Sequence, residues 1–178
     1  LHMADGKIKL AQEECESPHL AEAADALARM ETLIEDLLTI AREGTEVQET
    51  EPTRLEVLAE DSWGGVETDE ATLQNGTEHT IQADPSRLRQ LLENLIRNAV
   101  DHGGEDVTVR TGELEDGFYV ADDGPGIPAE ERDEVFEVGY STTAEGTGFG
   151  LNIVEEIVEA HGWEISVTDS DDGGARIE

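Results

Sequence analysis

The sequence predicts an α/β protein: a two-layer sandwich, with helices packed on one face of a sheet, preceded by a helical hairpin. Apolar residues at heptad spacing fill the first part of the chain, and strand-like and helical segments then alternate. Strands interleaved with helices favour one helical layer over one sheet. The expected organisation is a hairpin over 1–43, a linker over 44–53 and an α/β domain over 54–178.

The predicted hairpin rests on an apolar seam with spacings of 3 and 4, formed by Leu20, Ala23, Leu27, Met30, Ile34, Leu37 and Ala41. This is the heptad pattern of helices that pack along one stripe. Ser17-Pro18 breaks the chain before the seam, and Gly44 ends it. Because two hairpins bury such a seam better than one, we expect a homodimer built on a four-helix bundle. A hairpin packed on its own domain is the alternative.

The α/β domain is predicted element by element from periodicity, caps and turn residues. The expected helices lie within 54–66, after a short strand or turn, and over 84–102 and 150–160. The expected strands cover 79–83, 107–114, 117–121, 163–168 and 175–178. Asp84 and Pro85 provide an N-cap and a first-turn proline for the long helix. Glu115-Asp116-Gly117 forms the turn of a hairpin.

Composition excludes several functional classes. Acidic residues number 44 against 11 Lys and Arg, a formal net charge of -33, so nucleic-acid binding through a basic face is not expected. The lone Cys15 excludes an internal disulfide. No apolar run is long enough to cross a bilayer. We expect a cytoplasmic fragment of a longer protein, with any membrane segment outside this chain.

A polar stripe marks one face of the helix over 84–102. Asn94 and Asn98 stand one turn apart, and Asp101 and His102 continue the stripe. A solvated helix face would explain such a stripe. However, Asn is a poor helix former, and its carbonyl oxygen can ligate Mg²⁺ that is held mainly by phosphates. The stripe is therefore a candidate binding surface.

Two glycine clusters follow. Asp122-Asp123-Gly124-Pro125-Gly126-Ile127 ends a strand with a carboxylate that can accept a hydrogen bond from a base, although alone it reads as a turn. In Gly146-Thr147-Gly148-Phe149-Gly150-Leu151, alternate glycines precede an apolar helix whose free N–H groups can hold phosphate. The intervening stretch, over 123–147, has the length of a functional loop.

Taken in order, Glu93–Ala99 and the two glycine clusters resemble the N, G1 and G2 boxes of sensor histidine kinases. Val135-Phe136-Glu137 resembles their F box. The resemblance implies the ATP-binding fold shared by histidine kinases, gyrase and Hsp90 for 54–178, and part of the dimerisation and phosphotransfer hairpin for 1–43. The acidic composition of the chain and the sequence Asn98–Gly103 resemble those of haloarchaeal proteins.

The resemblance also implies ATP and Mg²⁺ as ligands. Asn98 matches the Mg²⁺ ligand and Asn94 a residue near the triphosphate, and both are expected to serve catalysis. His102 matches a position whose ring packs on the nucleotide, and Asp122 matches the adenine-binding acid. The other expected contacts are Asp101, Gly124, Gly126, Ile127, Tyr140, Ser141, Thr142, Gly146, Thr147, Gly148, Phe149, Gly150 and Leu151.

The implied reaction is transfer of the γ-phosphate of Mg-ATP to a histidine of the dimerisation helix, and thence to an aspartate of a response regulator receiver domain. The acceptor histidine is expected before Leu1, so this chain alone should bind ATP without phosphorylating itself. Asp101 and Thr143 stand where the family often has cations, and Ala175 where its last glycine box often has Thr.

Two alternatives stay open. A non-enzymatic nucleotide-binding dimerisation or scaffold module would keep the same fold. A gyrase- or Hsp90-type ATPase would need a glutamate base where Asn94 stands, which argues against hydrolysis.

The acidic excess predicts a salt requirement. Self-repulsion among charges destabilises the compact state at low ionic strength and is screened by salt. We expect the melting temperature to rise between low and molar KCl, measured by circular dichroism. A melting temperature that is unchanged across this range contradicts the prediction.

Overall fold

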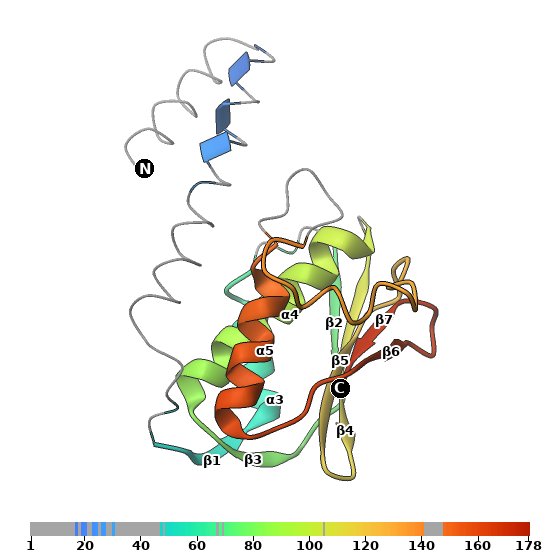
Figure 1. The fold of residues 1–178 in the computed structure, drawn as a ribbon. Coiled ribbons are helices and arrows are strands. Elements are labelled where there is room, and N and C mark those ends of the chain that lie inside the picture. Colours follow the sequence, from blue (N-terminus) through green and yellow to red (C-terminus); the bar gives the residue numbers. More distant parts are fainter. Residues whose placement is uncertain are drawn as a thin grey trace.

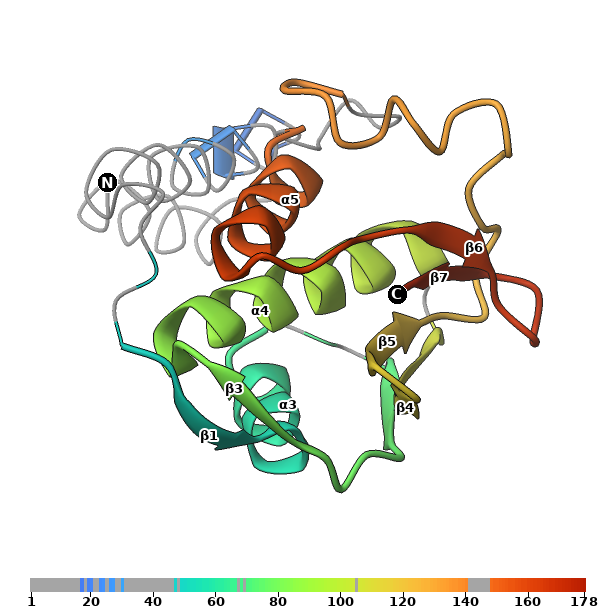
Figure 2. The ribbon, with the colours of Figure 1, turned by 60° about the horizontal axis from the view of Figure 1, so that its bottom comes forward.

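The computed structural model describes residues 17, 19–20, 23–24, 26–27, 30, 47, 49–66, 68, 70–104, 106–140 and 148–178 of the chain. Helices α3, α4 and α5 form one layer on one face of a five-stranded mixed sheet, and a two-stranded sheet lies beside the helices (Figures 1 and 2). The predicted two-layer α/β sandwich is confirmed.

The helices are α3 (Leu55–Trp63), α4 (Pro85–Gly103) and α5 (Gly150–His161). The strands are β1 (Glu51–Arg54), β2 (Thr72–Asn75), β3 (Thr80–Ala83), β4 (Thr108–Leu114), β5 (Gly117–Ala121), β6 (Val167–Asp169) and β7 (Ala175–Ile177). The larger sheet has the order β2-β4-β5-β7-β6, with β2 parallel to β4 and the other neighbours antiparallel. β1 and β3 pair antiparallel.

Three features of the strands differ from the sequence prediction. The expected linker over 44–53 is wrong at its end, because β1 begins at Glu51 and pairs with β3. β2 was not predicted, since Leu73 is its single apolar residue and its pairing with β4 is long-range. β6 begins at Val167 rather than Trp163, because its ladder with β7 starts at Val167.

Helix α4 is the centre of the core. Its apolar stripe was predicted and is fully buried: Leu88, Leu91, Leu92, Leu95, Ile96 and Ala99. This stripe packs with Leu55 of α3, Val109 of β4 and Val154 of α5, each of which is completely shielded from solvent. Burial of such side chains contributes roughly 1.5–3 kcal/mol each before the entropy of ordering is counted.

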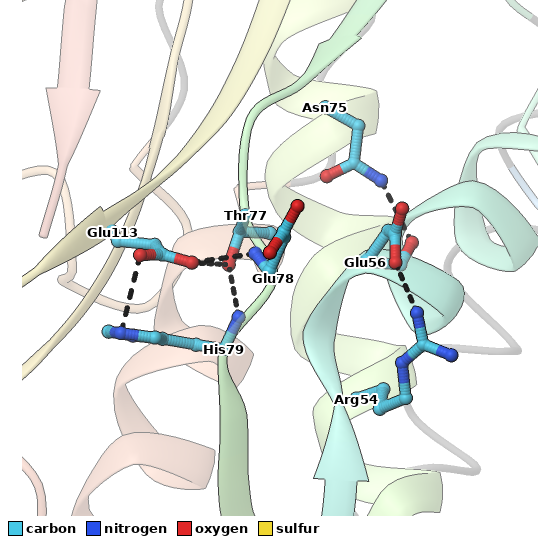
Figure 3. Close-up of polar contacts among 7 residues, drawn as sticks. All are labelled: Arg54, Glu56, Asn75, Thr77, Glu78, His79 and Glu113. Atoms are coloured by element: carbon cyan, nitrogen blue, oxygen red, sulfur yellow. Dashed lines mark hydrogen bonds and ion pairs between the residues drawn. The ribbon is translucent and has the colours of Figure 1, made fainter.

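Polar contacts tie the edge strand β2 and the segment after it to their neighbours (Figure 3). Glu113 of β4 accepts from the Glu78 backbone N–H at 2.6 Å and lies 3.3 Å from His79 Nε2. The Asn75 side chain donates to the Glu56 carbonyl of α3 at 2.8 Å. The side chain of His79 therefore has Glu113 as a structural partner.

His161 joins the end of α5 to the start of α4. Its Nε2 accepts the Asp84 backbone N–H at 3.1 Å, which requires Nδ1 to carry the proton and donate to the Ile157 carbonyl at 2.8 Å. The ring stacks on Trp163 with 4.3 Å between centroids. His161 is thus a structural residue in the described part of the chain.

Most of the predicted hairpin lies outside the described residues. The described positions between 19 and 30 are helical, while Ile34, Leu37 and Ala41 of the predicted seam are not described. The four-helix bundle and the homodimer stay predictions. No helix in the described ranges combines the length and the apolar character that a bilayer crossing needs.

The N-cap of α4 gives a stability prediction. Asp84 Oδ1 accepts the backbone N–H groups of Ser86 and Arg87 at 3.0 and 3.3 Å. We expect Asp84→Ala to lower the free energy of unfolding by about 1 kcal/mol, measured by urea denaturation. Asp84→Asn keeps an oxygen acceptor and should retain most of that stability. An equal loss in both variants would show that the cap bonds are not responsible.

Candidate functional site

The asparagine pair of α4 faces the first residue of α5. A β-carbon placed on Gly150 would lie 3.2 Å from Asn98 Oδ1 and 3.5 Å from Asn94 Oδ1. Asn98 and Gly150 are 52 residues apart in the sequence, and the packing of α5 against α4 brings them together. A side chain at this position would crowd the two Asn carbonyl oxygens, and glycine avoids this.

The two asparagines differ in their hydrogen bonding. Asn94 is 6% exposed, and its Nδ2 donates to the Gln90 carbonyl at 2.9 Å, one turn back along α4. The Nδ2 atom of Asn98 is buried and has no hydrogen-bond partner among the described residues. Because a buried polar atom without a partner costs about 1–3 kcal/mol, this atom indicates a bound ligand.

Asp122 ends β5 and is held by backbone from two directions. Its Oδ1 accepts the N–H groups of Gly124 at 2.9 Å and of Ala175 at 3.2 Å. Burial raises the pKa of the Asp122 carboxyl, and these two bonds partly oppose that shift. Both bonds end on one oxygen, so Oδ2 is left for a further partner.

Gly174 sits against this carboxylate. A β-carbon on Gly174 would overlap both Oδ1 and the backbone of Asp122, so only glycine fits there. Sequence analysis did not select Gly174. The Gly173-Gly174 pair directly before the last strand was the available signal, since consecutive glycines commonly mark close backbone approach.

The end of α4 meets the first glycine cluster. A β-carbon on Gly124 would lie 2.6 Å from Gly103 Cα, so this close contact between the two segments requires glycine at position 124. His102, just before Gly103, is exposed and contributes a favourable charge interaction to Asp122. Asp101 is exposed as well. The stripe and the first glycine cluster therefore lie on one side of the domain.

The turn after Asp122 is fixed by glycine geometry and one arginine. Gly126 has a φ of 75°, a left-handed conformation that disfavours other residues. Arg132 donates from Nε to the Ile127 carbonyl at 3.1 Å and pairs with Asp169 of β6. Arg132 is the only Lys or Arg between Arg110 and Arg176, and this isolation was the signal that sequence analysis missed.

The segments on either side of residues 140–147 meet at two glycines. Gly139 donates its N–H to the Gly148 carbonyl at 3.0 Å, with φ values of 84° and 72°. A β-carbon on Gly148 would lie 2.5 Å from the Gly139 carbonyl carbon. Gly148 was predicted as a site residue, whereas Gly139 was not, because a single glycine after Val138 carries no motif.

The neighbouring predicted residues are anchored to the fold. Phe149 and Leu151 pack against the core, and Asn152 donates to the Phe136 carbonyl at 3.3 Å. The Tyr140 hydroxyl donates to Glu131 at 2.7 Å, which raises the Tyr140 pKa to about 12. Ser141, Thr142, Gly146 and Thr147 lie outside the described residues, so their assignment to the site stays a prediction.

Comparison with known proteins identifies relatives of this domain. Residues 83–178 match the family of histidine kinase-, DNA gyrase B- and HSP90-like ATPases. The chain is 41% identical over 107 residues to the sensor histidine kinase ZraS of Escherichia coli O157:H7, covering 58% of this chain and 23% of that protein. The chain thus spans about a quarter of the length of the curated relatives it matches.

Solved structures agree. The mycobacterial sensor histidine kinase MprB superposes with a TM-score of 0.62 at 28% identity, covering 72% of this chain and 93% of that one. Full-length ShkA in complex with AMPPNP superposes with a TM-score of 0.67 at 30% identity, covering 89% of this chain and 36% of that one. The predicted resemblance to sensor histidine kinases is confirmed.

Gly174 provides a test of the Asp122 environment. We expect Gly174→Ala to push the Asp122 carboxyl from its two backbone donors, lower the melting temperature and weaken binding of a fluorescent ATP analogue at least tenfold. Gly117→Ala is the matched control, because a β-carbon there meets nothing within 4 Å. Unchanged analogue affinity in Gly174→Ala would contradict this description of the site.

Proposed function

Since the chain belongs to the family of histidine kinase-, DNA gyrase B- and HSP90-like ATPases, and within it resembles sensor histidine kinases, we propose that its domain transfers the γ-phosphate of Mg-ATP to a histidine of a dimerisation helix. The observation that carries this proposal is the buried Nδ2 atom of Asn98 beside Gly150, which has no hydrogen-bond partner in the part of the chain that the structure describes. An unpartnered amide next to an open glycine backbone is suited to a ligand of phosphate and metal.

The residues present fit Mg²⁺ bound through ATP. Within the described residues, no group of three or more His, Cys, Asp and Glu is arranged to hold a metal ion. Mg²⁺ keeps most of its ligands as water and phosphate oxygens, so one protein oxygen, Asn98 Oδ1, is sufficient. When bound, Mg²⁺ would neutralise part of the charge on the phosphates.

Groups of the protein itself would orient the nucleotide and make its polar contacts. Asp122 Oδ2 would accept a hydrogen bond from the adenine amino group, with Gly124, Gly126 and Ile127 lying beside the base. The backbone N–H groups of the first turn of α5, which begins at Gly150, would face the phosphates. Asn94 and Asn98 would orient the phosphate chain from the other side, and His102 would lie against the nucleotide.

The arrangement favours transfer over hydrolysis. Asn94 stands one turn before Asn98, where a glutamate base would be needed to activate water. An amide cannot accept that proton, and Asn94 Nδ2 already donates to Gln90. The remaining predicted contacts, Asp101, Tyr140, Phe149 and Leu151, would frame the pocket. A non-enzymatic scaffold is less well supported, because the glycine contacts that keep the site open are intact.

The relatives suggest the domain arrangement, the partners and the location that we propose for this reaction. The region over 1–43 would belong to a dimerisation and phosphotransfer hairpin, followed by a short linker and a catalytic domain that includes β1 and therefore begins at Glu51. The partners would be a second copy of the protein and the receiver domain of a response regulator. The domain would act in the cytoplasm.

Asn98 offers the direct test. We expect the purified chain to bind an ATP analogue in a Mg²⁺-dependent manner and not to incorporate labelled phosphate at histidine. Asn98→Ala should remove most of the Mg²⁺ dependence, measured by titration calorimetry with and without Mg²⁺. Asn75→Ala, in β2, is the control for loss of an amide elsewhere. Mg²⁺-independent binding to the unaltered chain would contradict the role given to Asn98.

Asp122 gives a pH prediction with a defined sign. The raised pKa means that the carboxylate is protonated at a higher pH than an exposed aspartate. Because Oδ1 is engaged by two N–H donors, the proton would sit on Oδ2 and turn the adenine acceptor into a donor. We expect ATP affinity to fall as the pH decreases through this raised pKa.

Protonation of Asp122 should not destabilise the fold in this pH range, because a raised pKa means that the folded state favours the protonated carboxyl. Asp122→Asn should bind weakly and lose this part of the pH dependence. The same pH profile in Asp122→Asn as in the unaltered chain would assign the dependence to another group.

A further inference from the structure

The turn between β6 and β7, over 170–174, lies against the Asp122 site. Asp122 pairs with the residue after this turn in both directions: its backbone N–H donates to the Ala175 carbonyl at 2.9 Å, and its Oδ1 accepts the Ala175 N–H at 3.2 Å. A β-carbon on Gly126 would lie 3.3 Å from the Gly174 carbonyl oxygen. The turn therefore contacts both Asp122 and the first glycine cluster, and Figure 2 shows it beside the segment that follows β5.

Arg132 bridges the first glycine cluster and the β6–β7 hairpin through two different nitrogen atoms. Its Nε donates to the carbonyl of Ile127, the residue after Gly126, at 3.1 Å. Its Nη2 pairs with Asp169, the last residue of β6. The side chain of Arg132 is 22% exposed and that of Asp169 is 80% exposed. The guanidinium is therefore largely covered where the two segments meet, whereas its acidic partner stands at the surface.

The two-point contact is geometric more than stabilising. An ion pair with so exposed a carboxylate contributes little to the free energy of unfolding. A planar guanidinium, however, holds its donors in fixed directions, so contact with a carbonyl and a carboxylate together sets the spacing of the segments that carry them. A lysine ammonium is a single donor centre on a flexible stem and would not fix both partners. The chemistry of arginine is thus suited to positioning at this place.

A second arginine holds the same turn from the sheet. Arg110 of β4 pairs with Asp172 in the turn, and its Nε donates to the Gln74 side chain of β2 at 2.8 Å. This contact attaches the turn to β4 and β2, whereas Arg132 attaches the hairpin to the glycine cluster. Because the turn is already fixed to the sheet, the Arg132 bridge sets the position of the cluster relative to Asp122.

We propose that Arg132 is a positioning residue that sets selectivity for a purine with a 6-amino group. By holding Gly126 and Ile127 near the β6–β7 hairpin, it fixes the width of the space in which Asp122 Oδ2 meets that amino group. The inference rests on the proposed function, because it takes Asp122 to face adenine. A wider space weakens this hydrogen bond first, since hydrogen bonds depend steeply on distance and angle. The phosphate contacts at the start of α5 belong to another element and are retained.

The test compares ATP with purine riboside triphosphate, in which hydrogen replaces the amino group. Selectivity is the ratio of the two dissociation constants, measured by titration calorimetry with Mg²⁺. We expect the unaltered chain to prefer ATP by about tenfold or more, as befits a hydrogen bond to a charged group. Arg132→Ala should lower this ratio at least threefold and change the affinity for purine riboside triphosphate less than twofold. A merely structural role would weaken both nucleotides equally and leave the ratio unchanged.

Three further variants make the comparison decisive. Asp169→Ala removes the exposed partner and leaves the bond to Ile127, so it should fold and lose part of the selectivity. Arg132→Lys keeps the charge and should recover only part of it. Arg89→Ala is the matched control, because it removes an exposed arginine that pairs with Asp61 on the helical layer, at 3.2 Å. Its selectivity should equal that of the unaltered chain.

Unchanged selectivity in Arg132→Ala and Asp169→Ala would overturn the inference, and so would an equal loss in Arg89→Ala. If Arg132→Ala does not fold, Asp169→Ala decides by the same criterion. Full recovery in Arg132→Lys would overturn the two-point geometry, because charge alone would then be sufficient.

Amide hydrogen exchange separates this inference from the proposed function, because it needs no nucleotide. The Ala175 N–H, bonded to Asp122, should exchange at least fivefold faster in Arg132→Ala, measured by NMR relative to the Leu95 amide of α4. An unchanged Ala175 rate would show that Arg132 does not hold the hairpin. If the unaltered chain binds no ATP, the proposed function fails while the exchange rates still test the bridge. Faster exchange with unchanged selectivity would overturn the role in base selection.

Discussion

The packing of α4 between the sheet and α5 is the constraint on which the rest of the domain depends. One face of this helix carries the six buried apolar residues, and the adjoining face carries Asn94 and Asn98. Because side chains three and four residues apart share a face, the burial of the first stripe fixes the direction of the second. The packing of the core therefore sets the direction in which the asparagine pair points.

Close backbone approach is the second recurring feature. Gly124 lies on Gly103, Gly148 on Gly139, Gly150 on the asparagine pair and Gly174 on Asp122. Gly150 and Gly174 lie against polar side chains, whereas Gly124 and Gly148 lie against backbone, and each position leaves little or no room for a β-carbon.

The charge distribution sets the conditions under which this fold works. With 44 acidic residues and 11 basic ones, few cations are available to compensate phosphate, and those on the domain are used structurally. Arg132 secures the turn after Asp122, Arg176 stacks on Tyr119, and Arg110 pairs with Asp172. In the proposed function, phosphate binding would rely on backbone N–H groups, on Asn98 and on Mg²⁺, and salt in the solvent would screen the remaining repulsion.

The sequence alone determined the fold class, the long helix with its cap and the β4–β5 hairpin, because these follow from local periodicity and turn residues. Its ordered motifs predicted the positions of the candidate site. Tertiary structure decided β1 and β2, the role of Gly139 and Gly174 and the anchoring by Arg132. Those features depend on partners that are distant in the sequence, such as Asp169 for Arg132 and Asp122 for Gly174. The physical reason is that periodicity records which face of an element is buried, whereas the partner across a contact is set only when the elements pack.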